Sequence, residues 1–355
     1  MQTILLFGAT GSVGAYTAIG LKEQGYNVIA VAHRKSDNGM FEENGIPYYS
    51  VDVSDQNTFD VLPQSGIDQV IHFAGAMPAR MKDYNPRLYV ETIVEGTLNV
   101  LEYMRRIGTK KIIFAQSISD ILYKFGTSTP IDPDSERCNP LTGDHAVYSI
   151  SKNAAVNLIE HYHAQYGFSR FILRLPTIYV YQPNPYYYVD GKLHWMGYRY
   201  LIDKAIKGEP IELWGDPTSE KEIVYVRDFV QIVERCVESQ EDGGIYNVGT
   251  GVGVSMEEQI HGIIEVFSPK NHPSIVIKTP DKPSSPHFRL DIKKTLALGY
   301  VPKYDYISYL EDFKKEMRIN RFAKIWGRPE DYPPLHTGDD MASSYCELNY
   351  KKLAA

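Results

Sequence analysis

The chain has 355 residues, 43% of them hydrophobic and 23% charged, which is enough for two domains or for one large unit with an added lobe. Its net charge is −7 and its basic residues are scattered, so nucleic acid is not an expected partner. The three cysteines stand far apart and no apolar run approaches the length of a membrane span, so we expect no disulfide framework, no structural metal site and no membrane insertion.

The first half of the chain alternates short apolar runs with longer helical patterns. Met1 leads directly into a strand-like segment and leaves no room for a cleaved leader, so we expect a cytoplasmic protein. We predict strands at residues 3–7, 27–32, 47–51, 69–73, 111–115 and 170–175, and helices at 12–23 and 86–106. This alternation gives parallel strands joined by right-handed crossovers. The expected fold class is therefore α/β with a doubly wound parallel sheet, the Rossmann architecture.

A glycine-rich turn follows the first predicted strand and opens the first predicted helix. Its glycines let backbone amides approach a pyrophosphate, and the helix N-terminus adds partial positive charge. The predicted cofactor loop comprises Gly8, Thr10, Gly11, Ser12, Val13 and Gly14. The alternative is a turn that only connects strand to helix, but its place before a helix and the strands that follow favour a dinucleotide site.

The end of the second predicted strand bears on which dinucleotide binds. NAD-selective sites usually place an acid there for the ribose 2′-hydroxyl, whereas this chain has Ala32 followed by His33, Arg34 and Lys35. Three basic or imidazole side chains suit a 2′-phosphate, so we expect NADP, with NAD as the alternative. The competing interpretation is that Arg34 and Lys35 belong to a solvated turn.

Two further strand ends are expected to contact the cofactor. Asp52 and Val53 follow the third strand and are placed to meet the adenine. Phe73, Ala74 and Gly75 follow the fourth, where small side chains let the cofactor pass closely.

The candidate catalytic residues are Ser117, Tyr148 and Lys152. A spacing of four residues on a helix puts Lys152 on the same face as Tyr148, where an ammonium stabilises a phenolate and lowers the pKa of the phenol. Such a tyrosine can exchange a proton with an alcohol or a carbonyl while a cofactor transfers the hydride. Ser117 ends a strand upstream. The competing interpretation of Tyr148 is an ordinary half-buried tyrosine.

The same spacing recurs at Tyr188 with Lys192 and at Tyr200 with Lys204. Gly191 makes a helix unlikely across the first pair, and no strand and serine precede the second, which is compatible with a helix. Context therefore singles out Tyr148.

The composition changes after residue 176, where a tyrosine- and proline-rich stretch begins. We predict a dinucleotide-binding domain over residues 1–176 with return segments in 223–248, of which 223–226 and 245–248 are candidate additions to the first sheet. A substrate lobe is predicted over 177–222 and 249–328, with an irregular tail over 329–355.

His161 and His163 stand two apart and point in different directions on a helix, so we expect no metal site. His145 lies near Tyr148 either in the pocket or as a plain loop residue.

Together these motifs resemble the extended short-chain dehydrogenase/reductase family, of the NAD-dependent epimerase/dehydratase type. The resemblance covers roughly residues 1–320. It rests on the glycine loop, Asp52, the stretch 72–75, Asn99, Ser117 and the Tyr148/Lys152 pair, followed by 174–176, 225–228 and 246–249.

The resemblance implies a nucleotide-sugar substrate held between the sheet domain and the second lobe. Tyr148 would be the acid/base, Lys152 would hold the nicotinamide ribose, and Ser117 would hydrogen-bond the reacting oxygen. The cofactor site would include Pro176, and the substrate site would include Ser117, Ser119, Thr177, Lys221 and Arg289, of which Lys221 and Arg289 fall where diphosphate-binding cations are expected. The alternative for these two cations is exposed surface charge. A homodimer through the helices near 86–106 and 146–165 is also implied.

Departures from the family pattern bear on the reaction. Dehydratases carry an acidic pair directly after the active-site hydroxyl residue, but here Ile118 and Ser119 follow Ser117 and Asp120 comes one position late, which disfavours dehydration. Thr177 stands where asparagine is common. The leading hypothesis is NADP-dependent reduction of a keto-sugar. The alternatives are a nucleotide-sugar 4-epimerase with the same residues and a cofactor-binding sensor without turnover.

Overall fold

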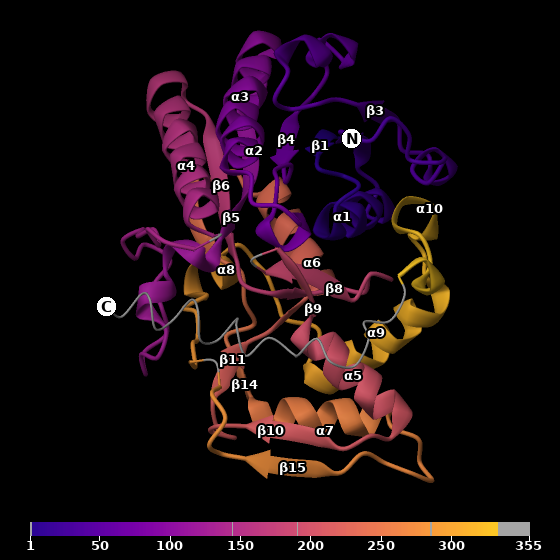
Figure 1. Ribbon diagram of the computed structural model, residues 1–355. Coiled ribbons are helices and arrows are strands. Elements are labelled where there is room, and N and C mark those ends of the chain that lie inside the picture. The colour runs from indigo at the N-terminus through magenta and orange to yellow at the C-terminus, as the bar shows by residue number, and fades with distance from the viewer. Residues whose placement is uncertain (1, 144, 190, 285, 333–355) are drawn as a thin grey trace.

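A seven-stranded parallel sheet forms the larger part of the protein (Figure 1). The computed structural model describes residues 2–143, 145–189, 191–284 and 286–332. The strands of the sheet are β1 (Thr3–Phe7), β2 (Asn27–Ala32), β3 (Tyr48–Ser50), β4 (Gln69–His72), β5 (Lys111–Ser117), β6 (Ser169–Leu175) and β13 (Gly243–Asn247). Their order is β13-β6-β5-β4-β1-β2-β3. The predicted doubly wound α/β fold is confirmed.

The strand order reverses between β1 and β4, which are hydrogen-bonded neighbours. Successive connections from β1 run to one side through β2 and β3, and those from β4 run to the other through β5 and β6. Ligands of open α/β sheets bind beyond the carboxyl ends of the strands at such a switch point. The segments that follow β1 and β4 are therefore the first places to examine.

Helices cover both faces of the sheet. They are α1 (Ser12–Glu23), α2 (Pro86–Tyr89), α3 (Gly96–Ile107), α4 (Ala146–Tyr166), α6 (Val226–Glu238) and the short α8 (Lys293–Ala297), with a π-helical segment Val90–Glu95 joining α2 to α3. Alternation along β1 explains the two layers: Ile4 and Leu6 share a core with α1 and α6, whereas Leu5 and Phe7 share one with α3 and α4.

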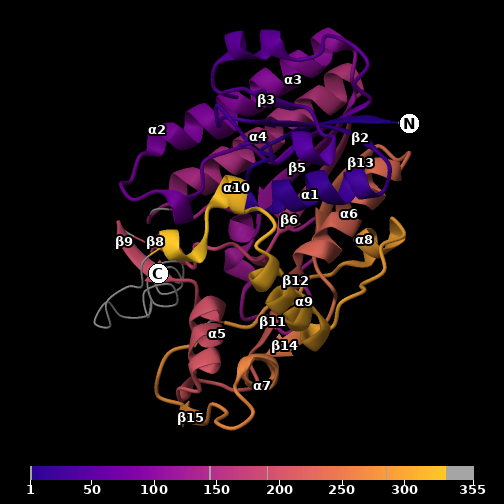
Figure 2. The same cartoon turned by 90° about the vertical axis from the view of Figure 1, so that its right-hand side faces the viewer.

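The second lobe is built from small sheets and three longer helices, and it lies beyond the carboxyl edge of the main sheet (Figures 1 and 2). Its strands are β7 (Ile178–Tyr179), β8 (Tyr186–Val189), β9 (Lys192–Trp195), β10 (Ile211–Trp214), β11 (Glu220–Glu222), β12 (Val224–Tyr225), β14 (Gly253–Ser255) and β15 (Val276–Thr279). Its helices are α5 (Gly197–Lys207), α7 (Met256–Phe267) and α9 (Tyr306–Ile319), followed by α10 (Ala323–Trp326).

The return of the chain to the main sheet differs in part from the prediction. β13 adds to β6 and α6 packs against α1, as expected of segments within 223–248. The stretch 223–226 does not join the main sheet, because β12 pairs with β7 and Val226 already begins α6. Of the predicted tail, only residues 329–332 are described. No helix among the described residues has the length and apolar character needed to span a bilayer.

Candidate active site

The turn between β1 and α1 brings three backbone segments into close contact. Gly8 has φ of +85°, and its amide donates to the carbonyl of Val31 at 2.8 Å. A Cβ on Gly8 would lie 2.7 Å from the backbone nitrogen of Ala74, and one on Gly14 would lie 2.1 Å from the carbonyl oxygen of Gly8. Glycine is therefore required at both positions, because a side chain would push the turn away from β4 or from the helix.

The start of α1 fits the pyrophosphate of a dinucleotide. Gly11 precedes the helix with extended backbone angles, and no side chain caps it. The amides of Ser12, Val13 and Gly14 belong to the first turn, where no carbonyl of the helix can accept from them. Amides without a partner inside the helix, together with its positive end at the switch point, suit an anionic pyrophosphate. Thr10 is buried in the same turn.

The loop after β2 presents its cations to solvent, with one of them engaged. His33, Arg34 and Lys35 are all exposed. Arg34 Nη1 donates to the carbonyl of Ile325 in α10 at 2.6 Å, so this guanidinium contacts a distant part of the chain. The exposure of all three side chains agrees with a solvated turn, but Arg34 also makes a tertiary hydrogen bond that this interpretation did not include.

The two residues predicted to meet the adenine differ in exposure. Asp52 is exposed and its carboxylate accepts from the amide of Ser54 at 3.0 Å, whereas Val53 is buried. Asn99 of α3 donates from Nδ2 to the carbonyl of Val53 at 2.9 Å, which fixes this loop against the helix.

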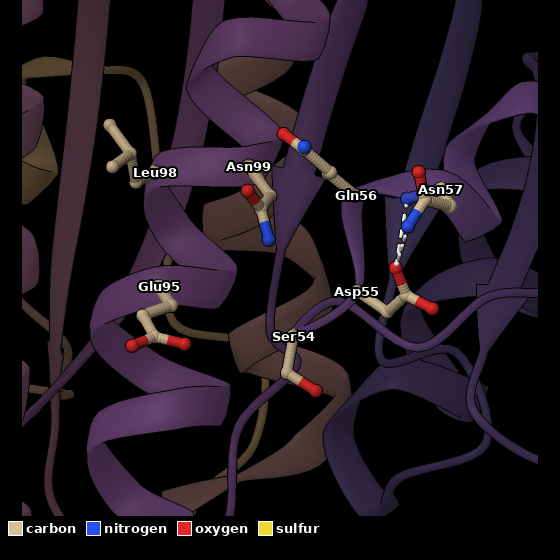
Figure 3. Close-up of a pocket in the computed structure, with 7 residues that line it drawn as sticks. All are labelled: Ser54, Asp55, Gln56, Asn57, Glu95, Leu98 and Asn99. Atoms are coloured by element: carbon tan, nitrogen blue, oxygen red, sulfur yellow. Dashed lines mark hydrogen bonds between the residues drawn. The ribbon is translucent and has the colours of Figure 1, made fainter.

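A polar depression lies next to this loop. Figure 3 shows its lining, formed by Ser54, Asp55, Gln56, Asn57, Glu95, Leu98 and Asn99. None of the three catalytic candidates lines this depression, so it is not the site of their chemistry.

The segment after β4 lies beside the glycine turn. Phe73, Ala74 and Gly75 are half-buried, and the amide of Phe73 donates to the carbonyl of Phe7 at 3.0 Å. His72 before them is fully buried; its Nε2 lies 3.2 Å from Thr97 Oγ1. Burial, followed by the nearby positive charge of Lys152, lowers the pKa of His72 to about 3, so this ring is neutral.

Lys152 connects α4 to the end of β5. Its Nζ donates to the carbonyl of Ala115 at 2.7 Å and lies 4.6 Å from the ring centroid of Phe114. The side chain is buried, and burial lowers the pKa of Lys152 from 10.5 to about 7. Because Ala115 precedes Ser117 by two residues, this bond brings the helix that carries Tyr148 to the carboxyl end of β5.

Tyr148 and Ser117 are both half-buried at this edge of the sheet. The ring of Tyr148 packs edge-to-face with Tyr89, with centroids 5.8 Å apart, and with His145, with centroids 6.3 Å apart. His145 therefore lies beside the candidate tyrosine. Ser117 Oγ accepts from the amide of the buried Ser119 at 3.2 Å.

The two other Tyr/Lys pairs have different settings. Tyr188 and Lys192 lie on the two strands of the β8–β9 hairpin. Tyr200 and Lys204 share helix α5, with Lys204 Nζ 5.4 Å from the centroid of the Tyr200 ring, and this helix lies in the second lobe. Only the pair at Tyr148 lies at the carboxyl edge of the main sheet.

Asp120 forms a buried ion pair directly behind the loop that follows Ser117. Arg174 of β6 binds its carboxylate through Nε at 2.9 Å and Nη2 at 3.0 Å, and both side chains are at most 1% exposed. Arg174 Nη1 also donates to the carbonyl of Pro133 at 2.8 Å and to Asn247 Oδ1 at 3.1 Å. The pair therefore joins β6, β13 and the segment after Ser117.

The two candidate diphosphate-binding cations lie on paired segments but one residue out of register, so their side chains point to opposite faces. Lys221 of β11 is bridged to Phe288, the residue before Arg289. Arg289 is exposed; its Nη2 donates to the carbonyl of Ser128 at 3.2 Å, and its Nε lies 3.7 Å from Glu220 Oε2. At the end of β6, Pro176 is buried and Thr177 is exposed.

Sequence reasoning missed the C-terminal segment beside the glycine turn. Trp326 Nε1 donates to the carbonyl of Thr10 at 2.8 Å across 316 residues. Sequence reasoning also did not assign the pairing of Asp120 with Arg174. Neither contact has a local motif; the only available signal was the unusual acid at position 120.

Comparison with known proteins gave concordant matches. Residues 4–249 match the profile described as the NAD dependent epimerase/dehydratase family. A putative UDP-glucose 4-epimerase of Methanocaldococcus jannaschii is 26% identical over 302 residues, covering 85% of this chain and 94% of that protein. UDP-glucuronic acid decarboxylase 5 of Arabidopsis thaliana is 27% identical over 333 residues, covering 90% and 91%.

Solved structures agree with the fold. The UDP-N-acetylglucosamine 4-epimerase of Bacillus cereus superposes with a TM-score of 0.69 at 18% identity, covering 90% of this chain and 97% of that one. The Thermus thermophilus UDP-glucose 4-epimerase, solved with NAD, has a TM-score of 0.65 at 23% identity, covering 88% and 99%. At these identities the likeness concerns the fold alone.

Proposed function

The chain belongs to the NAD dependent epimerase/dehydratase family, and from this premise we propose that it is a nucleotide-sugar 4-epimerase that keeps NAD bound. The observation that carries the proposal is the bond from Lys152 to the carbonyl of Ala115, which ties the helix that carries Tyr148 to the carboxyl end of β5, the strand that ends in Ser117. The relatives named as epimerases and decarboxylases support an activated sugar as the substrate.

The proposed chemistry is a reversible proton transfer at one sugar hydroxyl. A nicotinamide bound at the switch point supplies the hydride acceptor and donor. Tyr148 accepts the hydroxyl proton when the alcohol is oxidised and returns it when the ketone is reduced from the other face. Ser117 Oγ would hold the reacting oxygen, and the buried Lys152 would hold the cofactor ribose and favour the phenolate of Tyr148.

The environment of Asp120 supports a reaction without loss of water. An eliminating enzyme needs an acid free to protonate the leaving hydroxyl, whereas this carboxylate is buried and bound to Arg174. We propose that one of the two candidate cations, Lys221 or Arg289, binds the substrate diphosphate, since the bridge from Lys221 to Phe288 turns their side chains to opposite faces.

The loop after β2 favours a second candidate, an NADPH-dependent keto-sugar reductase. Ala32 offers no carboxylate to a ribose 2′-hydroxyl, and His33 and Lys35 are exposed. A 2′-phosphate would suit a reductase, which exchanges NADPH with the cell. Against this, Arg34 already donates to Ile325, and we place this candidate second.

One experiment tests the proposal and separates the candidates. The purified protein is denatured, the released nucleotide is identified by mass spectrometry, and the native protein is then incubated with UDP-glucose and UDP-glucuronic acid. The expected result is NAD together with conversion to the C4 epimer without added cofactor. Release of NADP, together with NADPH consumption by a 4-keto nucleotide sugar, would replace the epimerase by the reductase.

A matched pair of variants tests the assignment of Tyr148. Tyr148→Phe is expected to reduce turnover at least about a hundredfold, because it removes the proton-transferring hydroxyl. Tyr200→Phe alters a tyrosine with the same lysine spacing in α5 and should retain activity. If the protein binds cofactor but neither the native protein nor any variant turns over a nucleotide sugar, the sensor interpretation holds instead.

A homodimer through α2–α3 and α4 is part of the same proposal. These helices leave Leu98 and Ile150 exposed by 39% and 42%. Sedimentation should give twice the chain mass, and Leu98→Glu with Ile150→Glu should shift it to the monomer.

A further inference from the structure

We propose that the segment from Phe322 to Trp326 is part of the dinucleotide site: it braces the two loops that hold the adenosine ribose and thereby slows cofactor release. This inference rests on the proposed function, since it concerns the same cofactor. Residues 322–326 lie outside the stretch 4–249 that matches the family profile. In Figures 1 and 2, α10 lies beside α1, far along the chain from it.

Side chains from the loop after β2 reach the carboxyl end of α10. Asn38 Nδ2 donates to the carbonyl of Lys324 at 2.7 Å, and Arg34 Nη1 donates to that of Ile325 at 2.6 Å. The carbonyls in the last turn of a helix have no partner within it, so they are free to accept such bonds. Tyr332 OH donates to the next carbonyl, that of Trp326, at 2.5 Å.

The glycine turn is held by the same segment from the other side. Trp326 Nε1 donates to the carbonyl of Thr10 at 2.8 Å. Two residues C-terminal to Gly14, Tyr16 packs its ring against Phe322 with centroids 4.8 Å apart and against Trp326 with centroids 6.2 Å apart. The segment therefore contacts both loops and adds to the direct bonds from the amides of Gly8 and Ala9 to the carbonyl of Val31 at the end of β2.

Ion pairs fix the ends of this brace. Lys324 pairs with Glu43, beyond the loop after β2. The fully buried Glu316 accepts from Tyr16 OH at 3.2 Å and pairs with Arg321 at 2.6 Å and with Arg227 at 2.8 Å. A charge buried in this way must keep its partners, so α9 and the start of the segment hold a fixed position on α1.

The physical consequence is a pre-organised cofactor site. In α/β folds of this kind the adenosine ribose lies between the glycine turn and the end of the second strand. Loops held at a fixed separation lose little conformational freedom on binding, and a cofactor can leave only when the loops move apart. A cofactor that is regenerated within each turnover has no need to leave.

The test measures dissociation of NADH and NADPH from the full-length protein. Each complex is mixed with excess oxidised cofactor, and the loss of bound nicotinamide fluorescence gives the dissociation rate. Trp326→Phe keeps the ring packing and removes the bond to Thr10. Asn38→Gly removes the bond to Lys324 at a residue with φ of +54°, which glycine adopts freely. Trp214→Phe is the matched control, because it removes an indole bond to Glu212 in the second lobe.

Each of the two loop variants is expected to release cofactor roughly 3- to 10-fold faster, the effect of one lost hydrogen bond, and the control is expected to match the native protein. Equal dissociation rates in all four proteins would overturn the brace and leave the proposed function intact. Absence of saturable binding of either dinucleotide to the native protein would overturn the proposed function itself. If Trp326→Phe lacks the native thermal transition, Asn38→Gly decides the outcome.

Discussion

Replacing Arg174 by methionine should be among the most costly single changes in the sheet domain. The guanidinium is fully buried and neutralises the carboxylate of Asp120, which is 1% exposed. Without it, Asp120 keeps a buried charge, and the carbonyl of Pro133 and the amide of Asn247 each lose a donor. Breaking a buried pair in this way costs about 3–5 kcal/mol of the free energy of unfolding.

The control is Arg170→Met, four residues earlier on the same strand. Arg170 pairs with Glu160 at 3.1 Å, but their side chains are 17% and 34% exposed, so about 0–1 kcal/mol is expected. Urea unfolding followed by circular dichroism gives both values.

The double variant Asp120→Leu with Arg174→Met removes both charges and should recover much of the stability lost in Arg174→Met. Equal costs for Arg174→Met and Arg170→Met would refute the assignment of Arg174 as the neutralising partner. A double variant less stable than Arg174→Met would refute it as well.

Three further results are expected. Gly14→Ala should lower the free energy of unfolding by about 1–3 kcal/mol and abolish NADH binding, because its Cβ would lie 2.1 Å from a backbone oxygen. Gly197→Ala is the control: its Cβ would have no atom within 4 Å, so urea unfolding and NADH titration should give nearly native values. Burial lowers the pKa of Lys152 to about 7, so between pH 7 and 9 the unfolded chain binds a proton that the folded one does not. The free energy of unfolding of the cofactor-free native protein should therefore rise relative to Lys152→Met by about 1.4 kcal/mol per pH unit; parallel profiles would contradict this. A thiol reagent should modify the exposed Cys138 in the native protein but the buried Cys236 only after denaturation, because burial also raises the pKa of the Cys236 thiol. Peptide mass spectrometry distinguishes the two sites. Labelling of Cys236 in the native protein would count against the packing of α6.

Elements with strong local signals were predicted most accurately. The bounds of β1, α1 and β2 agree with the predicted 3–7, 12–23 and 27–32, because apolar runs, a glycine turn and a helical pattern follow one another directly there. β12 was misplaced because two strand-like residues carry no information about their partner, and the start of α6 at Val226 decides the pairing.

The parts of the site that depend on distant contacts were beyond local reasoning. Helical spacing predicts that Lys152 and Tyr148 lie on the same face of their helix. The partner of Asp120, however, lies 54 residues away along the chain, and that of Trp326 lies 316 residues away. Burial decided the role of Asp120, and burial is a property of the assembled fold. The basic stretch after β2 was correctly located at a strand end, but its engagement by α10 was not foreseen.

The position of β13 has a consequence for synthesis of the chain. β13 covers the open side of β6, yet it is made only after residues 177–242 have left the ribosome. Until then β6 is an outer strand with one unpaired edge, and Arg174 lacks its contact with Asn247. A fragment ending at residue 176 would therefore expose that strand to aggregation, and the nascent sheet can be completed only when residue 247 has emerged.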